Sequence, residues 1–277
     1  MILTIDIGNT KIIVARFDEN APMKDGCLTP VKTYRIPTND NWNINTIEVA
    51  LTMHWNVLEY GELTGCIISS VVPRLTYMFE DAVYNVTGIH SIIVRNNMKL
   101  GFRVEMDHPE KVGCDLLVDT CGAMTEHSGN LIIIDMGTAT TFSILRVEED
   151  QSKTYSGTII MPGLGISQKA LAENCAQLPE VDLYKLPKNG VRLDARNTVE
   201  SIQSGLVYGH AAMVDGMIER IMKNQNFAAE STTVIATGGL APTVLPNCYN
   251  KDIILDENLM LKGLYYLYEK NQVVDEI

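Results

Sequence analysis

Residues 1–18 read MILTIDIGNTKIIVARFD, and the fold of the chain follows from this stretch. Aliphatic and β-branched residues up to Ile7 lead into a Gly-Asn-Thr turn, and a second apolar run, residues 12–17, follows at once. Two such runs around a small-residue turn are typical of a β-hairpin. We therefore expect paired strands at the start of the chain, joined by a tip of small residues.

The tip of this hairpin has the composition of a phosphate-binding turn. Gly8 lets the backbone turn and approach a ligand closely, and Asn9 tolerates unusual backbone angles. Thr10 and Lys11 add a hydroxyl and a cation, so the turn can surround a phosphate with N–H groups. Asp6 ends the first strand and offers the oxygen ligand that Mg²⁺ prefers. An ordinary hairpin with an acidic surface residue would explain the same stretch.

The pattern occurs a second time in residues 131–145, which read LIIIDMGTATTFSIL. An apolar strand ends at Asp135, the turn contains Gly137 and Thr138, and another apolar strand follows. Two hairpins with an Asp-x-Gly turn, about half a chain apart, imply an internal duplication.

A third small-residue turn, Thr237-Gly238-Gly239, follows the apolar residues 234–236. Its glycines leave the backbone open, so that a nucleoside can lie against it. Three such turns after three strands resemble the actin, hexokinase and Hsp70 superfamily. The resemblance implies an α/β fold of two related RNase H-like domains with a nucleotide cleft between them.

Composition and charge restrict the partners of the chain. Its 277 residues are enough for two domains with a core each. Acidic side chains number 34 against 22 basic ones, the net charge is −12, and Lys and Arg form no cluster. Nucleic acid and anionic membranes are therefore poor partners.

No apolar run approaches the roughly 20 residues of a bilayer span and no secretory signal opens the chain, so we expect a cytoplasmic protein.

The six cysteines and five histidines have no zinc-like spacing, and no Cys-x-x-Cys pair occurs. In a reducing compartment we expect the cysteines to be small core residues. They are Cys27, Cys66, Cys114, Cys121, Cys175 and Cys248.

Hydrophobic periodicity predicts the remaining elements of the first half as a strand, a helix, a strand, a helix and a strand. The expected bounds are 31–36 after a turn from Pro22, 45–60, 66–72, 75–86 and 91–94. In the first of these helices Ile47, Ala50, Leu51 and His54 share one face. Residues 256–270 predict a C-terminal amphipathic helix whose core side chains are Leu259, Leu261, Leu264, Tyr265 and Leu267.

Residues 107–119 are where catalysis and specificity are expected to meet. Asp107, Pro109 and Glu110 have the pattern of a capping box at a helix start. Asp115 lies among apolar neighbours close to that start, which is unusual for a carboxylate without a chemical role. The residues alone leave two roles open for Asp115, a general base and a second capping residue.

An ordered set of motifs over nearly the whole chain resembles the type III pantothenate kinase family. The motifs are Asp-Ile-Gly-Asn-Thr at 6–10, Ser-Ser-Val-Val-Pro at 69–73, Pro-x-x-x-Gly-x-Asp at 109–115, Asp-Met-Gly-Thr-Ala-Thr-Thr at 135–141, Ile-x-Pro-Gly at 160–163, Leu-Pro at 178–179, Asn-Thr at 197–198, Gln-Ser-Gly-x-x-x-Gly at 203–209 and Thr-Gly-Gly at 237–239. No single motif is decisive, but the ordered set is highly specific.

The resemblance implies a kinase that transfers phosphate from ATP to the hydroxyl of pantothenate, the first step of coenzyme A biosynthesis. Such a kinase uses Mg²⁺ together with K⁺ or NH₄⁺, acts on a small-molecule alcohol and works as a homodimer. We expect residues 1–115 to form an N-terminal phosphate-binding domain. Residues 116–277 would then form a C-terminal domain with the nucleotide site and the dimer interface, to which 197–220 contribute.

Roles are implied residue by residue. Asp115 matches the aspartate that accepts the hydroxyl proton during attack on the γ-phosphate, Asp135 matches a K⁺ ligand, and Asp6 is a second catalytic candidate beside Mg²⁺. The implied ATP contacts are Asp6, Ile7, Gly8, Asn9, Thr10, Lys11, Ile12, Ile13 and Thr138, to which the third turn adds Gly238 and Gly239. The implied substrate contacts are Met106, Gly113, Cys114, Asp115, Leu116 and Thr198.

The acceptor pocket departs from the family's pattern. Met106 stands where the family has tyrosine, Leu116 where it has arginine, and Asp119 where asparagine is usual. An arginine beside the reacting atoms is a natural clamp for the carboxylate of a substrate, whereas leucine offers neither charge nor donor. The phosphate-binding motifs are therefore intact while the acceptor pocket differs.

Three functions are compatible with this sequence. The first is a kinase of pantothenate or a close analogue, with the carboxylate held by another group. The second is a paralogous kinase for a different, less anionic small alcohol. The third is a non-catalytic regulatory protein that binds a nucleotide or metabolite.

Overall fold

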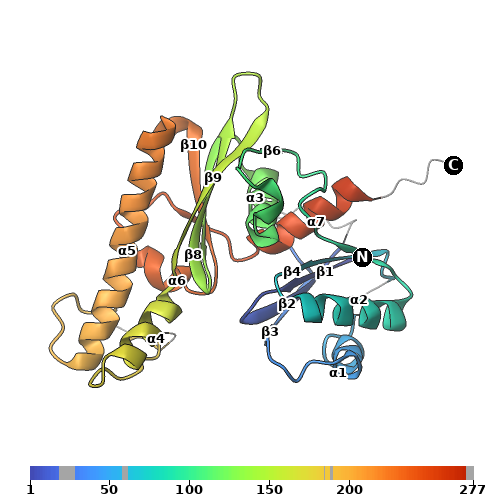
Figure 1. Ribbon diagram of the computed structural model, residues 1–277, viewed down its shortest axis with the longest axis horizontal. Coiled ribbons are helices and arrows are strands. Elements are labelled where there is room, and N and C mark those ends of the chain that lie inside the picture. Colours follow the sequence, from blue (N-terminus) through green and yellow to red (C-terminus); the bar gives the residue numbers. More distant parts are fainter. Residues whose placement is uncertain (19–28, 58–61, 184, 188–189, 273–277) are drawn as a thin grey trace. The chain divides into compact units, whose positions relative to one another are not determined.

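The computed structural model describes residues 1–18, 29–57, 62–183, 185–187 and 190–272 (Figure 1). Its chain separates into two compact units. The first comprises Met1–His127, Ser152–Thr154 and Asn258–Ile277, and the second comprises Ser128–Gln151 and Tyr155–Glu257.

This division differs from the expected one, which places a boundary after residue 115. That position falls inside helix α3, Cys114–Glu126, which belongs as a whole to the first unit. Helix α7, Leu259–Asn271, also belongs to the first unit, because it packs against α3, β1 and β4. The chain therefore returns to its first unit after it has completed the second.

The first unit is built on a five-stranded sheet with the order β3-β2-β1-β4-β5. β1 runs antiparallel to β2 and parallel to β4, and the expected hairpin and strands are confirmed. The strands are β1, Ile2–Ile7; β2, Lys11–Phe17; β3, Lys32–Pro37; β4, Gly65–Ser70; and β5, Ser91–Ile93.

The first expected helix, 45–60, is only partly correct. Helix α1, Ile44–Val49, continues as one wide π-type turn, Ala50–His54, closed by a bond from the Trp55 N–H to the Ala50 carbonyl at 2.7 Å. The extra residue in this turn moves the buried face by one position, so His54 is exposed and Trp55 is buried instead. The last three residues of the expected helix lie outside the described residues, as do residues 22–28 of the expected turn.

Helix α2, Pro73–Thr87, agrees with the expected helix and ends at Gly88, whose φ of 73° is readily adopted only by glycine. Its buried face packs on the first core, which also contains Trp55 stacked on Phe79 at 6.3 Å between ring centroids. The buried side chains of α2 are Leu75, Phe79, Ala82 and Val83.

Helices α3 and α7 make backbone contact within the first unit. A Cβ on Gly263 would overlap the Val118 carbonyl, and a Cβ on Gly122 would overlap the Leu259 carbonyl. A buried ion pair joins Lys262 Nζ to Glu126 Oε2 at 2.7 Å near the same crossing. The core side chains expected for the C-terminal helix are all buried, which confirms its orientation.

The second unit repeats the strand order of the first. Its strands are hydrogen bonded in the order β9-β8-β7-β10-β11, and β7 is antiparallel to β8 and parallel to β10, as β1 is to β2 and β4. This agreement confirms the duplication predicted from the two hairpins. The strands are β7, Asn130–Met136; β8, Ala139–Val147; β9, Lys153–Pro162, whose first two residues count with the first unit; β10, Thr232–Thr237; and β11, Ile254–Leu255.

The long helix α5, Thr198–Gln225, packs along this sheet and closes the second core (Figure 1). The other α-helices among the described residues of this unit are α4, Leu164–Asn174, and α6, Ala241–Val244, and Ala229–Ser231 and Leu245–Asn247 form short 3₁₀ helices. In the first unit, the short strand β6 comprises Arg103–Val104. Among the described residues, no helix combines the length and hydrophobicity needed to cross a membrane.

The described cysteines are free thiols. Cys66, Cys121 and Cys248 are buried, which agrees with the prediction, whereas Cys114 and Cys175 are half-buried. Burial raises the pKa of the Cys66 thiol to about 12, and it is the main cause that raises the pKa of the Cys248 thiol to about 11. Both thiols therefore stay protonated and unreactive. Cys27 lies outside the described residues.

Candidate active site

The tip of the β1–β2 hairpin is a tightly held turn. The Gly8 N–H donates to the Lys11 carbonyl at 2.9 Å, and a Cβ on Gly8 would lie 3.1 Å from that same oxygen. The Thr38 hydroxyl donates to the Gly8 carbonyl at 2.7 Å, and the Thr38 N–H donates to the Thr10 carbonyl at 3.0 Å. Asn9, Thr10 and Lys11 are exposed, so a rigid tip presents polar groups to solvent.

Thr38 was not among the predicted site residues. It follows β3, whose last residue, Pro37, pairs with Lys11 at the base of the tip. The only signal in the sequence was the third strand itself, which returns to the hairpin. Thr38 therefore supports the turn from a neighbouring strand.

The implied ATP-binding residues of β1 and β2 differ in what they can offer a ligand. Ile7 and Ile12 are fully buried in the first core and Ile13 is half-buried, so the two buried residues can contribute only backbone groups. Asp6 is half-buried and pairs in register with Ile13 on β2 and Ser69 on β4. Asp6 is therefore the second-last residue of the central strand, and only Ile7 separates it from the turn.

The expected capping box at residues 107–110 is wrong. The segment Pro109–Lys111 is a single 3₁₀ turn preceded by His108, without a side-chain cap, and α3 begins only at Cys114. Val112, extended at φ −64° and ψ 133°, interrupts the turn before a helix can form. Glu110 pairs instead with His108 at 3.4 Å on the surface.

Asp115 lies in the first turn of α3 and is half-buried. Its Oδ1 accepts the Leu116 N–H at 2.9 Å, which satisfies one of the N–H groups that a helix start leaves unpaired. Gly113 leaves space for the carboxylate, because a Cβ there would overlap Oδ1. The predicted residues Gly113, Cys114 and Leu116 therefore surround Asp115, and Leu116 is 7% exposed. Met106, from the preceding loop, is half-buried.

In the second unit, the Asp135 carboxylate lies against two glycines. A Cβ on Gly238 would be 2.5 Å from Asp135 Oδ1, and a Cβ on Gly137 would be 3.3 Å from Oδ2. Gly238 also has a φ of 94°, which an L side chain rarely adopts. Asp135 pairs in register with Thr237 on β10, so the structure brings the second and third predicted turns together.

Gly163 packs against one of the predicted turns, although it is not among the predicted site residues. It is the N-cap of α4, and a Cβ there would overlap the Thr138 carbonyl, so the helix start lies directly against the turn that carries exposed Thr138. The Ile-x-Pro-Gly motif at 160–163 was the available signal.

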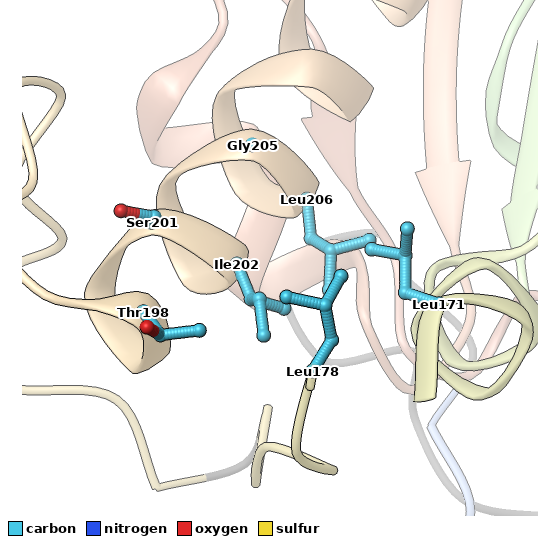
Figure 2. A pocket seen from close by; sticks show the side chains of 7 residues that line it. All are labelled: Leu171, Leu178, Thr198, Ser201, Ile202, Gly205 and Leu206. Carbon is cyan, nitrogen blue, oxygen red and sulfur yellow. The ribbon is translucent and has the colours of Figure 1, made fainter. Parts of the chain in front are cut away.

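Thr198 is the exposed first residue of α5, and its neighbour Asn197 caps the helix by accepting the Glu200 N–H at 3.0 Å. It borders a pocket of about 340 Å³ in the second unit, where leucine and isoleucine side chains from α4, α5 and the intervening segment converge (Figure 2). The pocket is lined by Leu171, Leu178, Thr198, Ser201, Ile202, Gly205 and Leu206. Thr198 belongs to the second unit, whereas the other predicted substrate contacts belong to the first.

Asp6 in the first unit and Asp135 in the second each offer one carboxylate to a cation of their own. In the part of the chain that the structure describes, no three His, Cys, Asp or Glu residues gather as a metal site. At Asp135, Gly137 and Gly238 pack directly against the carboxylate, so the other ligands of a cation there would be water, backbone or phosphate oxygens. This donor set fits Mg²⁺ or K⁺, which prefer oxygen ligands, better than a tightly caged transition metal.

Comparison with solved structures shows the fold. The ethanolamine utilization protein EutJ from Carboxydothermus hydrogenoformans has a TM-score of 0.50 at 12% identity, over 97% of this chain and 89% of that one. A ROK family glucokinase from Streptomyces griseus, solved with glucose and AMPPNP, has a TM-score of 0.50 at 12% identity, over 96% and 98% of the two chains. These likenesses confirm a two-domain α/β fold of the actin and hexokinase type.

Comparison with sequences shows the family. A model described as type III pantothenate kinase matches residues 2–220. The type III pantothenate kinase of Dictyoglomus turgidum is 38% identical over 98% of this chain and all of its own length (100%). That of Exiguobacterium sp. is 34% identical over 98% of this chain and 100% of its own. Since both comparisons span most of the sequence, the chain belongs to the type III pantothenate kinase family.

Proposed function

We propose that this kinase phosphorylates the hydroxyl of pantothenate with ATP, and that Asp115 is its general base. The observation that carries the assignment is the half-buried Asp115 carboxylate at the start of α3, for which Gly113 leaves space. The hydroxyl oxygen bonds to the γ-phosphorus while the bond from that phosphorus to the β,γ-bridging oxygen breaks. ADP leaves, and the hydroxyl proton passes to Asp115. No covalent intermediate with the enzyme is needed.

The two hairpin turns are the proposed phosphate-binding elements. The tip at Gly8 to Lys11 offers N–H groups, the Thr10 hydroxyl and the Lys11 cation. Thr138 offers a second exposed hydroxyl in the turn that duplicates it. The backbone at Gly238 and Gly239 is the proposed surface for the nucleoside, since glycine lets a ligand approach the chain closely.

Cations complete the proposed site. Asp6 would hold Mg²⁺ and Asp135 would hold K⁺ or NH₄⁺, each with oxygens that are not acidic side chains. Bound there, the cations would offset the negative charge of the phosphates. A cytoplasmic location, where thiols remain reduced, agrees with the free cysteines among the described residues.

Pantothenate is the acceptor that the family supports, and the relatives give no support to a neutral alcohol or to a non-catalytic regulator. Leu116 nevertheless stands where the family has an arginine that would pair with the substrate carboxylate. We expect Leu116→Arg to raise the ratio of kcat/KM for pantothenate to kcat/KM for its neutral alcohol analogue by about tenfold or more, because one well-placed charged partner contributes roughly 2 kcal/mol or more. Steady-state kinetics with both substrates measures this ratio.

Leu116→Met is the matched control, because it changes the shape of this buried side chain without adding charge. Its ratio should stay at the wild-type value. A wild-type enzyme that already prefers pantothenate at least about 100-fold, with no further gain in Leu116→Arg, would show that another group holds the carboxylate.

We also propose that the enzyme is a homodimer whose interface includes the N-terminal part of α5. Apolar side chains are exposed at and just before the start of α5, namely Leu193 at 70% and Val199, and Ile160 on β9 of the same unit is 67% exposed. Such side chains are commonly covered in a symmetric dimer.

Sedimentation should therefore give twice the 30.7 kDa of one chain, and Val199→Glu should shift the enzyme toward the monomer because a dimer would bury the new charge. Tyr77→Glu, on α2 of the first unit, is the control, since Tyr77 is even more exposed than Val199 but far along the chain from α5. A wild-type mass of one chain at all concentrations would exclude the dimer.

A further inference from the structure

The Asn96 side chain bridges three points of the segment that enters α3. Its Nδ2 donates to the Pro109 carbonyl at 2.9 Å and to the Val112 carbonyl at 2.8 Å. Its Oδ1 accepts the Cys114 thiol at 3.0 Å. One primary amide thus uses both donor hydrogens and its acceptor on residues 13 to 18 positions away in the chain.

These bonds fall where α3 has little support of its own. Its N-cap is Gly113, which has no side chain, and the 3₁₀ turn before it carries no side-chain cap. Pro109 and Lys111 are exposed, so this turn has few buried contacts that would fix it. The Asn96 amide therefore satisfies two carbonyls of the entering segment and holds the residue next to Asp115.

We propose that Asn96 is a positioning residue that sets the place of the Asp115 carboxylate by fixing the segment from Pro109 to Cys114. This inference rests on the proposed role of Asp115. Asn96 itself touches no reacting atom, and it acts through the backbone that carries the base. The hydrogen bond that Asn96 accepts from Cys114 requires a protonated thiol. The pKa of that thiol is raised, first by burial and second by the charge of Asp115.

The rest of α3 is anchored independently of Asn96. The helix packs on α7 through Gly122 and Gly263, and Glu126 pairs with Lys262 at its far end. Loss of the Asn96 bonds should therefore loosen the start of the helix without unfolding the unit. A displacement of about 1 Å at a catalytic group lowers the rate by roughly 100-fold.

The test compares Asn96→Ala and Asn96→Asp with Asn97→Ala. Aspartate keeps the shape and the acceptor but cannot donate to the two carbonyls. We expect both Asn96 variants to lower kcat by about 10- to 100-fold, with KM for ATP within about twofold of wild type and little change in Tm. The pH dependence of kcat should also shift, because the surroundings of the base change. The exposed neighbour Asn97 is the control, and its variant should behave as wild type.

A wild-type kcat and pH profile in Asn96→Asp would overturn the proposal, and so would a loss of activity that only follows a loss of folded protein. If Asn96→Ala does not fold, the isosteric aspartate variant still decides. Asp115→Asn, assayed in parallel, separates the two proposals. Full activity in that variant refutes the base itself, whereas an inactive Asp115→Asn with active Asn96 variants refutes only the positioning role.

Discussion

Asp115→Asn should lower kcat by about 10²- to 10⁴-fold, the usual contribution of a positioned general base. Asparagine has the same shape as aspartate and keeps an oxygen for the Leu116 N–H, so the start of α3 should be preserved. What it lacks is the capacity to accept the substrate's hydroxyl proton. Coupled measurement of ADP release with pantothenate, Mg²⁺ and K⁺ gives kcat, and KM for ATP should change little.

Asp81→Asn provides the matched control for this variant. Asp81 is an exposed carboxylate on α2 of the same unit, and its replacement should leave kcat unchanged. A loss of less than about tenfold in Asp115→Asn would mean that the carboxylate is mainly a capping group, which is the other role that its bond to Leu116 supports.

Gly263→Ala should destabilise the first unit by about 3 kcal/mol, at the upper end of the usual cost of overpacking. The added methyl group would overlap the Val118 carbonyl, and a backbone atom cannot move aside as a flexible side chain can. Helices α3 and α7 must separate, and the buried pair between Lys262 and Glu126 separates with them. Urea unfolding monitored by circular dichroism measures the loss.

Gly165→Ala, within α4, is the control for this substitution. Outside the local backbone of α4, no atom lies within 4 Å of the Cβ that it would add, so alanine should be neutral or stabilise the helix by up to about 1 kcal/mol. Equal unfolding midpoints for Gly263→Ala and the wild type would show that the two helices can part without cost.

The sequence predicted the parts of the molecule whose signal is local. Both hairpins have an apolar run, a turn of small residues and a second run, and this pattern allowed strands, turns and duplication to be identified together. The third turn at Gly238 followed a short apolar strand for the same reason. The ordered motifs then indicated the family, which the comparisons confirmed.

The predictions that were wrong or incomplete concern features that depend on contacts between residues far apart in the chain. The capping pattern at Asp107 does not start a helix, because the extended Val112 ends the 3₁₀ turn and α3 begins only at Cys114. Between the two, the distant Asn96 side chain donates to the Val112 carbonyl. The π-type turn at Ala50 changed which residue faces the core, and periodicity alone cannot reveal such an insertion. Thr38 and Gly163 were missed because each reaches a predicted turn from another element. The roles of the predicted site residues stay predictions until the variants are measured.

The return of α7 to the first unit bears on how the polypeptide folds as it leaves the ribosome. Residues up to His127 emerge early, but Leu264 and Tyr265, which are buried in that unit, are translated only after the whole second unit. Until then the nascent first unit exposes the apolar surface that α7 will cover, including Phe17, whose ring lies 5.1 Å from that of Tyr265. The intervening residues can complete their own core earlier. Folding of the first unit is therefore completed late, and its exposed apolar surface is a binding site for chaperones until α7 covers it.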